Sequence, residues 1–567
     1  MLAVARCLLL ALNVQLLSSP GWLEPVLGSS RAYLAATVLL TILNVTTVVF
    51  WERLAPGETA AHGFATGAAI LAGIAGAILL SAGTAAWLRE ILIYPHDSYR
   101  ADMLVVIQLA IRRFLQGGDP YALYKVPWDV PLPYGPVMWA PMIPPILLHA
   151  DVRFVTLAGM VFTPLACAFA AVAAAARGQR ALALGCVTVA GAFMASVDLR
   201  HFVPIGHTPV YWPLLGLLAW LVTREQWYGA AVTLGLLIVA RTTLVSIAPV
   251  LLIAVWFRAR PRFAGTLALL TAAAVLPYLP FAIWDARALE YGLYGSYQNV
   301  MKTFVWVSTT WVQHTIGTTA ILLSHGWERA VEIVQVVVLL ALYSGIAVAI
   351  RRGRRPLPWM ALVLLVFSMT TLWPVIYLYF DVCVLLVCGA LAELAVARTP
   401  RLTIVWTGLV AASAATVTIA ALAALPVNPD IDAGTAADRP FLYSGFSANE
   451  RDGNVTFAWV NGTRAEMLVP RRSRRDATIV IVCQPNLPTA EAVQQLSASL
   501  NGTVIGTVTL APGWQHVDLP APARAWQIGV NELTLFLSSA VSPKESGVGE
   551  DTRRLSLAVD RLTVRTP

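Results

Sequence analysis

The chain has 567 residues, of which 58% are hydrophobic and only 12% are charged, and its formal net charge is +8. Soluble globular proteins average about 25% charged residues, so this composition excludes that class and indicates an integral membrane protein. Because no long basic run or nucleic-acid motif occurs, the positive charge predicts no nucleic-acid partner and is interpreted through its placement around membrane segments.

Long apolar segments recur through the first three quarters of the chain. A helix needs about 20 mostly apolar residues to cross a bilayer, and we predict a polytopic α-helical membrane domain with about 11–13 spans. The first segment resembles a short signal sequence without a clear cleavage site, so we expect it to be a first anchor. Candidate spans lie near 1–18, 32–51, 63–89, 154–176, 181–197, 208–223, 262–283, 329–350, 357–373, 375–397 and 402–426.

Two further apolar stretches contain residues that a simple span does not tolerate. The stretch 228–256 holds Arg241 near its centre. A cation in lipid is costly, so we predict two short helices that meet at this arginine. The stretch 136–150 contains four prolines, which remove the N–H groups that a helix interior uses. We therefore expect a re-entrant or surface helix there.

Short basic loops predict the orientation of the chain, because cytoplasmic loops carry an excess of Lys and Arg. Four such loops, which we expect to be cytoplasmic, lie at 177–180, 257–262, 351–355 and 397–401. Alternation from them places the long loops 90–135 and 284–328, the short loop 198–207 and the C-terminal region on the opposite side. We predict a multi-pass protein of the cytoplasmic (inner) membrane with an extracytoplasmic C-terminal domain.

The sequence pattern changes after Pro426. Short runs with strand-like alternation follow one another, and Asn501-Gly502 is a strong hairpin signal. We predict a membrane domain over 1–426, a linker over 427–439 and an all-β sandwich or jelly roll over 440–567.

The cysteines suggest no metal site and no disulfide framework, because none of them has CxxC or metal-ligand spacing. Free cysteine is usually a small buried residue. We therefore expect core positions for Cys7, Cys167, Cys186, Cys383, Cys388 and Cys483. We expect neither a metal nor another cofactor.

The first outer loop contains a predicted helix between two breaks. It opens with YPHDSYRADM at 94–103, where charged residues follow a membrane-length apolar segment. Helical spacing runs over 100–116, and GGDPY at 117–121 ends the helix because glycine and proline break it. Asp119 within that motif is most naturally a turn residue.

Asp97 is the acid of this loop that we favour for chemistry. One interpretation is that it caps the N-terminus of the following helix. The other is a general base that takes a proton from a sugar hydroxyl, while His96 and Arg100 bind a phosphate. Asp102 lies five residues further on, off the same helical face, so we prefer Asp97.

Cations form a second feature of the predicted outer face. Arg241 lies between two apolar half-helices, where a cation is costly unless an anion meets it. That anion is either a lipid-linked phosphate or an internal carboxylate such as Asp97 or Asp381. The other cations are either snorkelling residues at the interface or parts of the same site: Arg200, His201, His207, Lys302 and His314.

Aromatic residues form a third feature, in two places. TLWPVIYLYFD contains Trp373, Tyr377 and Tyr379 near a predicted helix break at Pro374. Such rings occur in the aromatic belts of membrane interfaces, and sugars also stack on them, so both interpretations stay open. The loop 284–328 holds the other group: Trp284, Tyr291, Tyr294, Tyr297, Trp306 and Trp311.

Several motifs occur together in the first half of the chain: Asp97 after an early span, Tyr99, GGDPY at 117–121 and PYGP at 133–136. This layout, over roughly residues 60–430, resembles the GT-C superfamily of membrane glycosyltransferases, and especially its bacterial polyprenyl-phosphate-mannose-dependent mannosyltransferases. That family often has a lysine followed by a proline in a helical hairpin, where this chain has Arg241 followed by threonines. Asp97 also follows the third predicted span rather than the first.

The resemblance implies an inverting transfer of mannose, or of another hexose or pentose, from a lipid-linked donor to a glycan or glycolipid acceptor. The donor would be a polyprenyl-phosphate sugar in the lipid bilayer, and Asp97 would be the general base on the extracytoplasmic face. The departing phosphate would be bound by Arg241, Arg100, His96, Arg200 and His201. The sugar and acceptor would be bound by Tyr99, Tyr134, Trp306, Trp373 and Tyr377.

Two other classes of function compete with this one. A membrane transporter or flippase for a lipid-linked or sugar substrate typically has two related halves, and no such halves are evident here. A non-catalytic anchor would only present the C-terminal domain, which looks like a carbohydrate-binding fold or a structural cap. In that domain Trp514 and Trp526 either line a sugar site or pack in the core.

Overall fold

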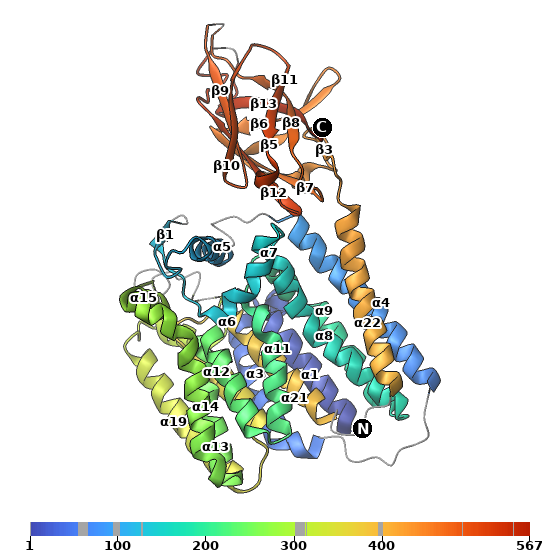
Figure 1. Ribbon diagram of the computed structural model, residues 1–567, viewed down its shortest axis with the longest axis vertical. Coiled ribbons are helices and arrows are strands. Elements are labelled where there is room, and N and C mark those ends of the chain that lie inside the picture. The colour runs from blue at the N-terminus through green and yellow to red at the C-terminus, as the bar shows by residue number, and fades with distance from the viewer. Residues whose placement is uncertain are drawn as a thin grey trace. The chain divides into compact units, whose positions relative to one another are not determined.

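The structure, a computed structural model, describes residues 2–54, 66–94, 102–125, 129–300, 312, 314–394, 401–489, 491–547 and 549–567. The chain forms two compact units (Figure 1). The helical unit comprises Met1–Trp87, Ser98–Ile143 and Arg153–Val417. The β unit comprises Leu88–Asp97, Pro144–Val152 and Thr418–Pro567.

Helices make up most of the helical unit. Its first half contains α1 Leu2–Ser18, η1 Pro20–Leu23, α2 Glu24–Leu27, α3 Ser29–Leu54, α4 Thr66–Leu92, α5 Asp102–Leu115, α6 Pro136–Trp139, η2 Ala140–Met142, α7 Ile143–Leu147, α8 Arg153–Ala176, α9 Arg180–Met194 and α10 Val197–Phe202. Strands β1 Tyr124–Lys125 and β2 Asp129–Val130 pair to form a two-stranded antiparallel ribbon.

The chain continues through η3 Thr208–Tyr211, α11 Trp212–Thr223, α12 Trp227–Ala240, η4 Thr242–Ile247, α13 Ala248–Arg258, η5 Arg260–Arg262, α14 Phe263–Val275, η6 Leu276–Tyr278, α15 Leu279–Glu290, η7 Tyr291–Gly295 and α16 Ser296–Val300. It ends with α18 Thr318–Ser324, α19 Ala330–Arg351, α20 Pro356–Thr370, α21 Leu378–Leu394 and α22 Arg401–Ala424.

Within the described residues, five helical segments are long and apolar enough to cross a membrane. They are Ser29–Arg53, Gly67–Leu92, Arg153–Ala176, Arg260–Val300 and Ala330–Arg351, and each overlaps a span predicted from the sequence. Shorter apolar helices accompany them. The predicted class, a polytopic α-helical membrane protein, is confirmed, whereas the total of about 11–13 spans stays a prediction.

The breaks predicted within apolar stretches are also confirmed. Helix α12 ends at Ala240, Arg241 has an extended backbone (φ −150°, ψ 116°), and η4 begins at the next residue. The proline-rich stretch 136–150 forms the short helices α6, η2 and α7 instead of one span. Pro374 lies between the end of α20 and the start of α21, where the sequence predicted a helix break.

Three helices of the helical unit meet in a buried ion pair. Arg6 on α1 lies 2.8 Å from Glu393 on α21, and its guanidinium stacks 3.6 Å above the Trp51 ring on α3. The Trp51 indole N–H also donates to Glu393 at 2.8 Å. A buried charge is tolerated when it is paired and hydrogen-bonded, so these contacts hold α1, α3 and α21 together.

The β unit is a two-layer antiparallel sandwich, which confirms the predicted fold. One sheet has the order β10-β9-β12-β7-β4, and the other has β11-β8-β13-β6-β5 with β3 paired to β13. The strands are β3 Asp430–Asp432, β4 Leu442–Ser444, β5 Phe446–Asp452, β6 Val455–Asn461, β7 Arg464–Arg471, β8 Ala477–Pro485, β9 Gln494–Leu500, β10 Thr503–Leu510, β11 Gln515–Ala521, β12 Gly529–Leu537 and β13 Leu555–Arg565.

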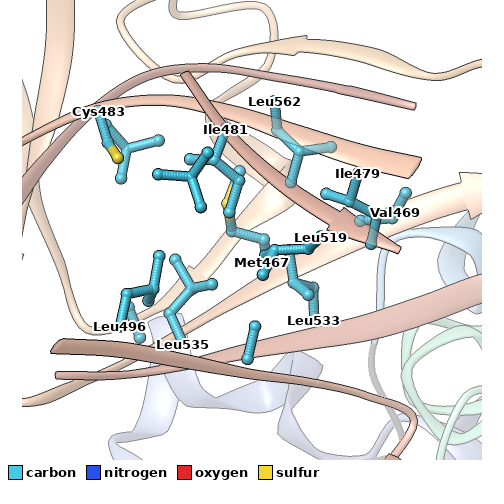
Figure 2. Close-up of a cluster of buried hydrophobic side chains, with 14 of the residues drawn as sticks. Met467, Val469, Ile479, Ile481, Cys483, Leu496, Leu519, Leu533, Leu535 and Leu562 are labelled. Atoms are coloured by element: carbon cyan, nitrogen blue, oxygen red, sulfur yellow. The ribbon is translucent and has the colours of Figure 1, made fainter. Parts of the chain in front are cut away.

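Apolar side chains from both sheets point toward one another and form the core of the sandwich (Figure 2). Ile479, Ile481 and Cys483 alternate along β8 toward this core, as the period-two pattern of a strand requires. All six cysteines are free and buried, as predicted from their apolar surroundings.

The start of the β unit differs from the expected linker. Asp430–Asp432, inside the segment 427–439, forms β3 and pairs with Arg561–Thr563 of β13. β3 pairs with the part of β13 that lies beyond its pairing with β6. This hydrogen bonding overrides the loop-like composition of the segment, and the sequence alone does not reveal it. The predicted hairpin is present: Asn501 (φ 50°) and Gly502 (φ 78°) connect β9 to β10.

A second segment joins the β unit from far away in the sequence. The loop after α7 pairs with the sandwich through a bridge between Ala150 and Ile528. The Arg474 guanidinium also donates to the Leu148 carbonyl at 2.9 Å. These contacts anchor the loop to the β unit.

Candidate functional site

A pocket of about 440 Å³ lies in the helical unit. Its volume falls within the range of about 300–1,000 Å³ that is usual for small-molecule sites. Three stretches of chain supply its walls: α10 with the following loop, the segment before α18, and the connection from α20 to α21 together with the start of α21. The lining residues are Asp198, His201, Phe202, Ile205, His314, Thr315, Val375, Ile376, Tyr377 and Phe380.

Helix α10 carries the acid and one histidine of the pocket. The Ser196 hydroxyl caps this helix by accepting the Leu199 backbone N–H at 3.3 Å. Leu199 and Phe202 are buried. Asp198 and His201, three residues apart on the same helical side, both face the pocket.

Asp198 is a half-buried carboxyl group, and the described residues offer its carboxylate no hydrogen bond. Burial raises the pKa of Asp198 to about 6, with His201 lowering the pKa and Glu24 raising it further. A carboxyl group that titrates near neutral pH in a pocket can accept and release protons there. The sequence interpretation missed Asp198, although the residue lies only two positions before Arg200 and three before His201.

His314 enters the pocket from the segment before α18. Its Nε2 atom lies 3.1 Å from the Ser29 hydroxyl oxygen, and its ring meets the Tyr33 ring edge-on with centroids 5.6 Å apart. Both contacts come from the start of α3, so α3 orients this histidine although 285 positions separate Ser29 and His314.

Tyr377 separates the pocket from a buried cation. Its ring stacks on Phe202, with centroids 5.7 Å apart and planes at 22°. Its hydroxyl accepts a hydrogen bond from the Trp373 indole N–H at 3.0 Å. The Arg241 guanidinium carbon lies 5.0 Å from the centroid of the same ring, within the distance of a cation–π interaction.

Arg241 has an internal hydrogen-bond network. The guanidinium Nη1 donates to the Thr208 hydroxyl at 2.9 Å and to the Tyr211 hydroxyl at 3.5 Å. Tyr211 in turn donates to Asp381 at 2.6 Å, and the Trp212 indole N–H donates to the other carboxylate oxygen at 3.0 Å. Of the anions considered for Arg241, the buried Asp381 is therefore connected to it through Tyr211.

Tyr134 lies beside a buried histidine. The Tyr134 and His207 ring centroids are 4.3 Å apart, and His207 is only 4% exposed. Neither ring nitrogen of His207 finds a hydrogen-bond partner among the described residues. Burial lowers the pKa of His207 to about 3, and the nearby Arg241 lowers it as well, so the imidazole is neutral at physiological pH.

The glycine of the PYGP motif explains how Tyr134 reaches this position. A Cβ on Gly135 would overlap the Val239 carbonyl oxygen at the end of α12. The Tyr278 hydroxyl donates to that same carbonyl at 3.0 Å. Only glycine permits so close an approach, which brings the motif against the helix end that precedes Arg241.

The remaining predicted site residues either do not line the pocket or fall outside the described residues. Arg200 is exposed and does not line the pocket. The residues that lie outside the described ranges are His96, Asp97, Tyr99, Arg100, Lys302 and Trp306. In the described ranges no group of three or more His, Cys, Asp or Glu side chains could hold a metal ion.

The two tryptophans considered for the β unit differ. Trp526 is 1% exposed within the sandwich core, and the Arg471 guanidinium stacks 4.2 Å from its ring centroid. It is a core residue and cannot line a surface site. Trp514 is 37% exposed.

The protein is therefore a multi-pass helical membrane protein with a C-terminal antiparallel β-sandwich. No family model matches its sequence, and no curated protein matches it.

Two solved structures, both carbohydrate-binding modules, are similar to about a quarter of the chain. One is the CBM36-1 domain of a multidomain xylanase from the hindgut metagenome of Trinervitermes trinervoides (10% identity, TM-score 0.17, 25% of this chain and 98% of that chain). The other is the C-terminal CBM6 of LamC from Zobellia galactanivorans (14% identity, TM-score 0.16, 24% and 99%). Similarity at this level says nothing about what this chain binds.

Proposed function

We propose that the chain is a membrane glycosyltransferase that transfers a sugar from a polyprenyl-phosphate donor to a glycan or glycolipid acceptor on the extracytoplasmic face. The observation that supports this most is the pocket, where an acid, two histidines and aromatic rings meet in front of the buried Arg241. Its residues belong to the predicted outer loops and to the break at Pro374. The motif layout that resembles the GT-C superfamily supports the same reaction.

In the proposed reaction the acceptor hydroxyl oxygen attacks the anomeric carbon of the donor sugar. The bond from that carbon to the phosphate oxygen breaks, and its electron pair leaves with the lipid phosphate. A carboxylate takes the hydroxyl proton. The sequence motif assigns this role to Asp97, and the pocket offers Asp198 as a second candidate.

Positive charge near the leaving phosphate favours its departure. His201 and His314 line the pocket directly, and Arg241 contributes its charge from behind Tyr377. Tyr377 and Phe202 provide stacked rings on which a sugar packs.

The experiment is sugar transfer in membranes from cells that express the chain. Radiolabelled polyprenyl-phosphate mannose is the first donor, other polyprenyl-phosphate hexoses and pentoses follow, and native lipid extract is the acceptor. Wild type is compared with Asp97→Asn, Asp198→Asn and the control Asp119→Asn. Asp119 lies in the same loop region as Asp97, and its carboxylate accepts the Tyr121 backbone N–H as a turn residue.

The variants are compared at equal amounts of protein in the membranes. If Asp97→Asn alone loses sugar transfer by at least 100-fold, Asp97 is the base. The same loss in Asp198→Asn alone assigns it to the pocket acid. If the wild type uses none of these donors, the proposal is wrong. Uptake or flipping of the labelled lipid would then favour the transporter alternative.

A further inference from the structure

One row of side chains crosses the outer face of a sheet in the β unit. Trp459 on β6 pairs with Ala558 on β13, and Ala558 pairs with Gln484 on β8. Paired residues of antiparallel strands project to the same side. Their neighbours Ala458, Val559 and Cys483 lie in the sandwich core, so the row faces away from that core.

A second tryptophan extends this row. Trp514 directly precedes β11, whose first residue Gln515 pairs with Cys483, so the register brings Trp514 beside Gln484. Its ring meets Phe457 with centroids 5.6 Å apart and planes at 63°. Phe457, two positions before Trp459 on the same strand, meets the Trp459 ring at 5.7 Å and 89°. All three rings therefore gather on one face.

The exposure of these rings differs in a way that suits a binding surface. Phe457 is 7% exposed, whereas Trp514 is 37% exposed. Phe457 forms the base on which the two tryptophans rest edge-on. Ala558 lies between Trp459 and Gln484 in the row, and its small side chain is itself buried under its neighbours.

Polar side-chain groups lie beside the rings and form no hydrogen bonds within the described residues. In the part of the chain that the structure describes, the indole N–H groups of Trp459 and Trp514 and the side-chain amide of Gln484 make no hydrogen bond. His516, the next outward residue after Trp514, is exposed. Unused donors and acceptors beside aromatic rings are the usual composition of a site that orients a polar ligand.

We propose that this face, defined by Trp459, Phe457, Trp514, Gln484 and His516, binds a neutral glycan chain. The indole rings stack on the C–H faces of sugar rings, as aromatic faces pack against polarised C–H edges. The free indole N–H groups, the Gln484 amide and the His516 imidazole bond the sugar hydroxyls. No bond is made or broken at this site.

The charges around the face favour a neutral ligand over an anionic one. Glu450 pairs with Phe457 across β5 and β6, and Asp518 is exposed on β11. The nearby cation Arg553 is already bound to Glu450 at 2.6 Å and to Asp551 at 2.5 Å. Arg553 is thus already engaged by two carboxylates, and the exposed carboxylate of Asp518 adds negative charge that disfavours an acidic polysaccharide. This site does not depend on the proposed transferase activity.

The test uses the full-length protein in a detergent without a sugar headgroup, which would otherwise compete. Affinity electrophoresis measures retardation by soluble mannan, arabinan, xylan and β-1,3-glucan, with polygalacturonate as the acidic comparison. The wild type is expected to be retarded by at least one neutral polymer and not by polygalacturonate. Trp514→Ala is expected to weaken that binding at least tenfold.

Two further variants separate binding from folding. Gln484→Ala removes an amide without a partner in the described chain, so the fold is expected to be unchanged while binding weakens about threefold to tenfold. Trp327→Ala removes a 58% exposed tryptophan of the helical unit and is expected to bind like the wild type. The proposal is overturned if no neutral polymer retards the wild type, or if Trp514→Ala and Gln484→Ala both bind normally.

Discussion

At the scale of the residue, the surroundings of Asp198 change its acid–base chemistry. It faces the pocket with His201 from its own helix, while Glu24 and Tyr33 interact with it from other elements and His314 lines the same pocket. Burial dominates, which is why its pKa rises although His201 is close. His201 is close to Asp198 in the sequence, but Glu24, Tyr33 and His314 are not. The sequence pattern around Asp198 therefore did not single out this acid.

Replacement of Asp198 is expected to change how stability depends on pH. Because its pKa is raised to about 6, the folded protein binds this proton more tightly than the unfolded chain does. The resulting stabilisation is present below the unfolded pKa of about 4 and is lost as the pH rises through about 6. Asp198→Asn should therefore raise the midpoint of thermal unfolding at about pH 7.5 more than at about pH 4.

The measurement is thermal unfolding of the detergent-solubilised protein across this pH range, with Asp119→Asn as the matched aspartate control. A difference between Asp198→Asn and wild type that stays constant with pH would contradict the assignment of the pKa near 6.

At the scale of elements, short helices and helix breaks, rather than the long helices, position the residues of the candidate site. The break at Arg241 follows from the cost of a cation in lipid, and the sequence predicted it correctly. The sequence also identified PYGP as a motif, but it did not reveal which part of the fold this motif contacts. That part is the end of α12, where Gly135 contacts the Val239 carbonyl.

Gly135→Ala is expected to disturb this approach. The added methyl group overlaps a backbone carbonyl, which cannot rotate away as a side chain can. Overpacking of this kind costs about 1–3 kcal/mol, so the unfolding midpoint should fall and sugar transfer should decrease. Gly191→Ala is the control, because nothing lies within 4 Å of a Cβ at that helical position. Equal unfolding midpoints for the two variants would show that the contact is not tight.

At the scale of the whole molecule, orientation in the membrane was predicted from charge alone. The basic loop that contains Arg352 joins α19 to α20, and the β unit follows α22. From the positive-inside rule we predict that the loop is cytoplasmic, and from alternation of the spans we predict that the β unit lies on the opposite side.

Cysteine labelling tests this orientation, because all six native cysteines are buried and should react little. In intact spheroplasts a membrane-impermeant maleimide should label Thr509→Cys, an exposed position on β10, and not Arg352→Cys. Arg352→Cys should react only after permeabilisation. Labelling of Arg352→Cys alone in intact spheroplasts would reverse the predicted topology.

Local patterns were enough to predict the membrane helices, the break at Arg241, the Asn501-Gly502 hairpin and the β-sandwich. Hydropathy, charge and turn preferences act within a few residues of the chain, so they are readable without a fold. Only the tertiary structure connected Arg241 through Tyr211 to Asp381, brought Asp198 to a pocket with His314, and aligned Trp459 with Gln484 and Trp514. Those contacts join residues far apart in sequence, and they depend on which helices pack and in which register the strands pair.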